Sequence, residues 1–130
     1  MDVEVDLRQV VYALSDTLVL VGMNDFYHGK RVGLMAVEVA RCLGMKDDGR
    51  EELFDTGLLH ACGLSSTAVH QHLVAEMDWA GSQGHCERGY GLLEGMPRLA
   101  RMAPVVLYHH THWQDFTRMD VAPTWPKRPT

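Results

Sequence analysis

The sequence predicts an all-α protein, a single helical bundle of about six helices. Apolar residues recur at intervals of three and four along most of the chain, which is the period of an amphipathic helix. Alternating or β-branched runs that would indicate strands are weak throughout. The chain has 130 residues, of which 46% are apolar and 22% charged, and this suits one globular domain with its own core.

Two helices are expected in the first third of the chain. The first runs from Leu7 to about Val21, where Gly22 ends it. The second runs from about Phe26 to Leu43, and Gly44 is a suitable C-terminal stop. The capping residues expected before it are Asn24 and Asp25. The apolar repeat of the first helix consists of Val10, Val11, Leu14, Leu18 and Val21. An inward stripe of the second is expected among His28, Val32, Leu34, Met35, Val39 and Leu43.

A third helix is predicted from near Asp48 to His60, with Asp47 or Asp48 as its cap and Gly63 closing it. Leu53, Gly57 and His60 share one stripe of this helix, because they are spaced by four and three.

A fourth helix is expected from roughly Thr67 to Met77, capped within residues 65–67. Its histidines, His70 and His72, cannot face the same way, and we expect both to be partly exposed.

The last two helices contain glycine and proline at informative positions. The fifth is predicted over His85 to Leu93, where Gly89 and Gly91 indicate close packing against another backbone or a ligand. The sixth is predicted from Pro97 to about His110, with Pro97 in its first turn and Pro104 kinking it or shortening its start. The proline-rich residues 117–130 should hold no regular structure, so we divide the chain into a domain over 1–116 and a tail or linker over 117–130.

Charge and composition exclude several classes of protein. A net charge of −5 argues against a general nucleic-acid-binding face. No apolar run approaches the length of a membrane span, and the N-terminus is acidic, unlike a signal peptide. The odd number of cysteines, three, argues against a disulfide framework and for a reducing cytoplasm.

The eight histidines are the unusual feature of the composition. Five of them lie on or at the ends of four predicted helices: His28, His60, His85, His109 and His110. Imidazoles from separate helices can converge in a bundle core to bind zinc, iron, nickel or copper. The alternative, that these are scattered core and surface histidines, stays open from spacing alone.

Other polar residues beside these histidines have two interpretations each. Lys30 and Arg31 follow His28 and could hold an anion, or they could belong to a solvated helix face. Cys62 and Cys86 follow or adjoin His60 and His85 and could act as soft ligands, although small buried cysteines are commoner. Cys42 has no partner in sequence.

Taken in order, these segments resemble the HD superfamily of metal-dependent phosphohydrolases, most closely its HD-GYP branch, over about residues 10–116. The segment from His28 to Val32 resembles the family's first histidine segment, and Leu58-Leu59-His60 resembles the one that ends in its His-Asp pair. The segment from His85 through Gly89 to Leu93 resembles the family's His-Pro segment, and Val106 to His110 its double-histidine segment. The resemblance implies an HD-domain-like bundle whose metal ligands carry over to His28, His60, His85, His109 and His110.

The chain also departs from the family pattern, which indicates a degenerate, truncated HD-GYP domain. Ala61 stands where the family has its metal-bridging aspartate, and Leu64 stands where a lysine usually follows the glycine of this segment. Thr111 stands where the family has an acid after the double histidine. Residues 113–116 replace the glycine-tyrosine-proline signature. Two divalent cations held only by neutral imidazoles would repel each other. A single metal on the histidines at 85, 109 and 110, with water in an open position, is the site that remains.

Three functions follow as hypotheses. The first is a catalytically impaired sensory or regulatory module in bacterial signalling, with little or no cyclic dinucleotide hydrolysis, since in-line attack needs both cations. The second is a mononuclear metal-dependent phosphohydrolase with a shifted substrate. The third is a helical protein-interaction domain with structural histidines. We expect either one transition metal (zinc, iron or nickel) or none. The expected partners are a protein or adjacent signalling domain, or a second copy in a homodimer, without nucleic acid or membrane insertion.

Overall fold

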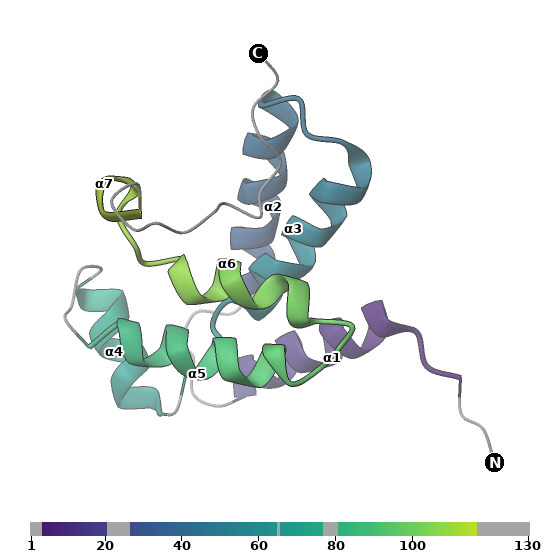
Figure 1. The fold of residues 1–130 in the computed structure, drawn as a ribbon. Coiled ribbons are helices and arrows are strands. Elements are labelled where there is room, and N and C mark those ends of the chain that lie inside the picture. Colours follow the sequence, from purple (N-terminus) through teal and green to yellow (C-terminus); the bar gives the residue numbers. More distant parts are fainter. Residues whose placement is uncertain (1–3, 21–26, 65, 77–80, 117–130) are drawn as a thin grey trace.

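The computed structural model describes residues 4–20, 27–64, 66–76 and 81–116, and the regular structure within them is all helical (Figure 1). This confirms the predicted all-α bundle. The helices are α1 (Leu7–Leu20), α2 (His28–Cys42), α3 (Asp47–Leu59), α4 (Thr67–Ala75), α5 (Gln83–Glu94), the 3-10 helix η1 (Ala100–Met102), α6 (Ala103–Tyr108) and α7 (Trp113–Phe116).

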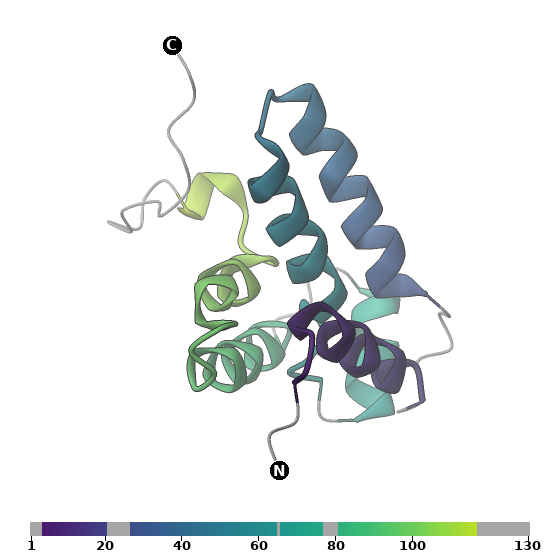
Figure 2. The same cartoon turned by 90° about the vertical axis from the view of Figure 1, so that its right-hand side faces the viewer.

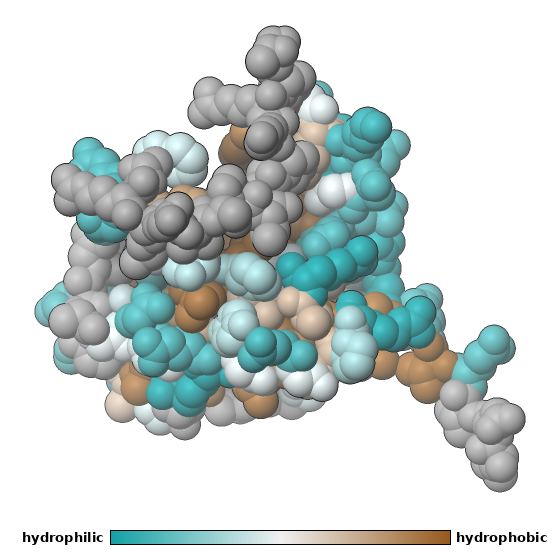
Figure 3. Space-filling view, viewed as in Figure 1, coloured by the Kyte–Doolittle hydropathy of each residue, from teal (hydrophilic) through white to brown (hydrophobic). Residues whose placement is uncertain are grey.

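Helix α3 lies at the centre of the bundle, because it packs against α1, α2 and α6. Figure 2 shows α2 and α3 as an antiparallel pair, with α1 crossing below them and α5 and α6 side by side. The core between these elements is a cluster of buried apolar side chains: Val11, Leu58, Leu59, Leu93, Leu99, Met102, Ala103 and Val106. Over α5 the surface is mainly hydrophilic, with small apolar areas between polar residues (Figure 3). The core therefore stabilises the ends of α3, α5 and α6 against one another.

Small residues let α2 and α3 approach closely. A methyl group built on Gly57 would lie 2.6 Å from the Cα of Gly33, so only glycine is accommodated there. Gly33 and Ala40 are the buried residues of α2. The prediction that the large apolar side chains of this helix face inward is therefore wrong. Four of them lie outside, with exposed fractions of 59% to 69%: Leu34, Met35, Val39 and Leu43.

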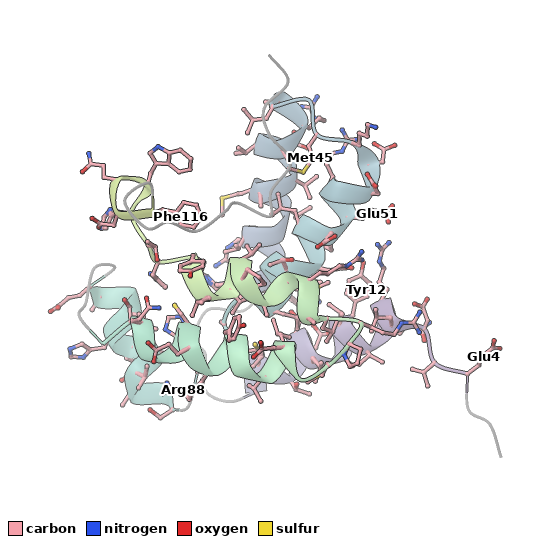
Figure 4. The ribbon with its side chains drawn as sticks, viewed as in Figure 1. Glu4, Tyr12, Met45, Glu51, Arg88 and Phe116 are labelled. Atoms are coloured by element: carbon pink, nitrogen blue, oxygen red, sulfur yellow. The ribbon has the colours of Figure 1, made fainter. Side chains whose placement is uncertain are left out.

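Helix α1 is held against α3 by apolar, aromatic and ionic contacts. Val11 is fully buried, whereas Leu14 of the predicted apolar repeat is exposed. An ion pair joins Arg8 to Glu51 at 3.0 Å, and the ring of Tyr12 meets that of Phe54 edge-on. Glu51 and Tyr12 are labelled in Figure 4. Ser15, four residues after Val11 on the same face of the helix, is also buried, so the inward stripe of α1 runs through positions 11 and 15 and Leu14 lies beside it.

Helix ends differ in detail from the sequence expectation. Lys46 is the N-cap of α3, and Asp47 and Asp48 lie inside its first turn, where they favour the helix dipole without capping it. Ser66 caps α4 as expected, since its side chain accepts a hydrogen bond from the backbone N–H of Val69. His70 is buried, so its predicted partial exposure is wrong; His72 is exposed as predicted.

The pair α5 and α6 also depends on glycine. A methyl group on Gly89 would lie 2.7 Å from Cγ1 of Val106, whereas one on Gly91 would meet nothing, so close packing is confirmed only at Gly89. The predicted sixth helix is divided into η1 and α6. Pro104 stands in the first turn of α6 and shortens its start, as expected, but Pro97 lies in a turn and begins no helix.

The capping residues Asn24 and Asp25, the end of the first helix at Val21 and the tail over 117–130 lie outside the described residues. Within the described part of the chain, no helix is long and apolar enough to cross a membrane.

Candidate metal centre

The ends of four helices bring together the five histidines that the sequence singled out. His28 begins α2, His60 follows the last residue of α3, and His85 lies in the first turn of α5. His109 and His110 follow α6. The rings form one connected cluster, with centroids 5.0 Å apart for His28 and His60, 5.3 Å for His60 and His109, 5.0 Å for His85 and His109, and 5.0 Å for His85 and His110.

Backbone carbonyls fix the orientation of two of the rings. Nδ1–H of His60 donates to the carbonyl oxygen of Gly57 at 2.6 Å, and Nδ1–H of His109 donates to that of Val106 at 2.6 Å. A carbonyl can only accept, so Nδ1 carries the proton in both rings and Nε2 keeps its lone pair. Metal-binding histidines are typically held by this kind of second hydrogen bond.

The Nε2 atoms face one another in two pairs. Those of His28 and His60 are 3.1 Å apart, and those of His85 and His109 are also 3.1 Å apart. Two imidazoles on a tetrahedral zinc, with Zn–N of 2.0–2.1 Å, have nitrogens about 3.4 Å apart. The spacing of each pair is therefore close to that of two ligands on one metal.

Burial keeps the imidazoles of His60, His85 and His109 neutral, which is the form that binds a metal. Loss of water lowers the pKa of His60, His85 and His109 from 6.5 to about 4 each, and the neighbouring imidazoles lower it further in each case. His85 is 2% exposed, and its Nδ1 has no hydrogen-bond partner among the described residues.

Cys86, which was not among the predicted site residues, lies inside the histidine cluster. Its Sγ is 3.6 Å from Nδ1 of His109 and 3.9 Å from Nε2 of His85. The side chain is fully buried, and burial raises the pKa of its thiol to about 11. Its position next to His85 in the first turn of a helix was the sequence signal for it, and both of the interpretations weighed for it, buried residue and soft ligand, agree with this placement.

The donor set fits a soft or borderline transition metal. Within the described ranges, the group whose ligand atoms converge closely enough to hold an ion is His85, Cys86 and His109, and no carboxylate belongs to it. Nitrogen and sulfur donors suit zinc, iron or nickel better than magnesium or manganese.

Ala61 occupies the place where the family resemblance has a metal-bridging aspartate. It is 7% exposed and lines a small pocket with room for about one water molecule, together with Lys30. Nζ of Lys30 is 2.7 Å from Asp16 and lies over the ring of Tyr27, so this lysine is already paired. Arg31 is exposed on α2. The anion-binding role considered for Lys30 and Arg31 stays a prediction.

The fold and the cluster together define a helical domain with a candidate histidine-rich metal site. The chain is similar to the 3'3'-cGAMP-specific phosphodiesterase 1 of Vibrio cholerae serotype O1, with 35% identity over 118 residues. The match covers 91% of this chain and 27% of that protein, so the chain spans about a quarter of its relative's length. No family model and no solved structure matches. The similarity supports the resemblance to the HD superfamily of metal-dependent phosphohydrolases.

Proposed function

We propose that this chain is a catalytically impaired HD-type module that holds one transition metal and serves a regulatory role in bacterial signalling. This proposal rests on two observations. The chain is similar to a 3'3'-cGAMP-specific phosphodiesterase, and its histidine cluster lacks the carboxylate that the family resemblance implies at position 61. His85, His109 and His110 would hold the metal, and His28 and His60 would form the second pair of rings beside them. When bound, the metal would act as a Lewis acid toward any oxygen ligand that reached it.

The observation that carries the proposal is Ala61. A methyl group directly after His60 offers no oxygen, and the convergent group of His85, Cys86 and His109 includes no carboxylate. A second divalent cation would therefore lack the negative charge that offsets repulsion between two ions. Hydrolysis of a phosphodiester by two metals needs both ions in place. The site is thus expected to bind a metal without turning over cyclic dinucleotides.

The exposed apolar face of α2 supports contact with a protein partner or an adjacent domain. Leu34, Met35, Val39 and Leu43 lie on it, and each is more than half exposed. Exposed apolar patches on a protein surface often mark sites of contact with another protein. The free cysteines Cys42, Cys62 and Cys86 support a reducing location, for which we propose the cytoplasm.

Activity assays on the purified chain test the proposal. The chain loaded with zinc, iron or manganese is incubated with 3'3'-cGAMP and with a chromogenic phosphodiester. We expect no turnover above that of a His60→Ala variant. Metal-dependent hydrolysis that the His60→Ala variant loses would overturn the regulatory assignment.

That second outcome would favour a mononuclear phosphohydrolase with a shifted substrate. The convergence of five histidines favours this phosphohydrolase, because a site without catalytic activity has no chemical need for so many metal-binding side chains. A third candidate, an interaction domain with structural histidines, is favoured by the α2 face. It predicts that alanine at His85, His109 and His110 together leaves partner binding unchanged.

A further inference from the structure

We infer that Cys86 is a thiolate ligand of the bound metal, which closes the site as a zinc centre of three histidines and one cysteine. The inference rests on the proposed metal site and names its metal class and its coordination. Cys86 would complete a set with His85, His109 and His110.

The geometry around Cys86 supports its role as a ligand. Its Sγ is 3.9 Å from Nε2 of His85, and that nitrogen is 3.1 Å from Nε2 of His109. With Zn–S of 2.3 Å and Zn–N of 2.0–2.1 Å, tetrahedral coordination has sulfur and nitrogen about 3.6 Å apart. The observed separations therefore need shifts of only a few tenths of an ångström.

His85 adds to the geometry on the other side of the thiol. This side chain is 2% exposed, and its Nε2 faces the cluster, close to both Nε2 of His109 and Sγ of Cys86. His85, Cys86 and His109 are also the described group whose ligand atoms converge closely enough to hold an ion. The thiol of Cys86 contacts the carbonyl oxygen of Ser82 at 3.5 Å in addition to the two imidazoles.

Charge explains why a thiolate suits this site. Imidazoles are neutral, and Ala61 has removed the carboxylate that the family resemblance implies. Binding would form a metal–sulfur bond and release the thiol proton to water, so one negative charge would return to the metal. A site with four protein ligands has no open position for water, which is the arrangement of structural zinc sites. A thiolate ligand would thus explain how the chain binds a metal without hydrolysing a phosphodiester.

Cobalt substitution of the full chain tests the inference, since Co²⁺ replaces zinc and reports thiolate ligands by a charge-transfer band in the near ultraviolet. We expect this band in the wild-type chain and its loss in Cys86→Ser, with cobalt affinity lower by about tenfold or more. Cys62→Ser is the matched control, because Cys62 is also partly buried with a thiol pKa raised to about 11, yet lies outside the ligand group. That variant should keep the band.

The wild-type spectrum decides the matter even if Cys86→Ser fails to fold. Zinc X-ray absorption should then show one sulfur at about 2.3 Å with nitrogens at 2.0–2.1 Å. Tetrahedral or octahedral cobalt without the charge-transfer band would overturn the thiolate ligand and leave the histidine site standing. Absence of cobalt and zinc binding would overturn both this inference and the proposed function.

Discussion

At the scale of single residues, the site depends on how each imidazole is protonated. His60 and His109 are oriented by carbonyls three residues before them, at Gly57 and Val106, so the last turn of each helix positions its own imidazole. Both Nε2 lone pairs then point at a second imidazole. This arrangement suits the proposed metal, and without a metal each facing pair can share one proton between its nitrogens.

Acid should destabilise the metal-free chain. The pKa of His60, His85 and His109 is about 4 in the folded state and 6.5 when unfolded, so the unfolded chain binds more protons between these values. Stability is therefore complete above pH 6.5 and falls toward pH 4, by about 3 kcal/mol for one such imidazole. Denaturant unfolding in a chelator between pH 7.5 and 4.5 measures this. A stability independent of pH would contradict the assignment.

Returning a carboxylate to position 61 should change metal preference. In Ala61→Asp, hard oxygen donors adjoin His60, and such donors suit manganese. We expect manganese to bind on the order of tenfold more tightly to Ala61→Asp than to Ala61→Asn, a difference of about 1.4 kcal/mol. The asparagine variant matches the aspartate in size and lacks its charge. Isothermal titration of both variants measures the difference, and equal affinities would show that position 61 does not face the metal.

At the scale of helices, glycines determine how closely the elements carrying the histidines approach. Gly57 meets Gly33 between α3 and α2, and Gly89 meets Val106 between α5 and α6. Each contact lies near one histidine pair, His28 with His60 and His85 with His109. Wider spacing of either helix pair would separate the ring nitrogens.

Two glycines of α5 provide a matched test of this packing. Gly89→Ala should destabilise the fold by about 1–3 kcal/mol, because its methyl group would overlap Val106. Gly91→Ala meets no atom within 4 Å and should stabilise the helix by about 0.5–1 kcal/mol. Thermal and urea unfolding of both variants measures this, and equal changes at the two positions would refute the packing argument.

The helices could be predicted from the sequence better than their inward faces. Periodicity located α1, α2, α3 and α5 to within a few residues, because their apolar positions repeat regularly. On α2 the same pattern pointed the wrong way: Gly33 and Ala40 face inward and Leu34 and Met35 outward. The apolar pattern does not show which helices pack at short distance, and a short distance between two helices requires small residues on the facing sides. His70, expected at the surface, is buried for a reason of tertiary packing that spacing cannot show.

The grouping of the five histidines could be predicted more completely than the core, and their role as metal ligands stays a prediction. The family resemblance marked His28, His60, His85, His109 and His110, and the structure brings them together. Cys86 could not be assigned from spacing, because adjacent residues on a helix usually diverge by about 100°. Its approach to His85 and His109 depends on how α5 and α6 pack.

At the scale of the whole molecule, the site joins elements that are distant in sequence. The proposed ligands lie on α5 and after α6, and the neighbouring histidine pair comes from the start of α2 and the end of α3. A metal bound there would crosslink the bundle, and since the unfolded chain lacks the site, binding would stabilise the fold.

Zinc should therefore raise the melting temperature of the whole chain. At a free concentration about one hundred times the dissociation constant, the gain is about 2.7 kcal/mol. Calorimetry with zinc, with magnesium and with a chelator measures it. Magnesium should have no effect, because the described ligand group has no carboxylate oxygen. Stabilisation by magnesium equal to that by zinc would contradict the nitrogen and sulfur site.

The metal content of the purified chain, determined by plasma mass spectrometry without added metal, tests the central claim most directly. The account predicts about one zinc, iron or nickel per chain, and less than that once the three histidines at 85, 109 and 110 are replaced by alanine. A folded chain free of metal, which takes up none when it is supplied, would contradict it and leave the five histidines as structural residues of the bundle.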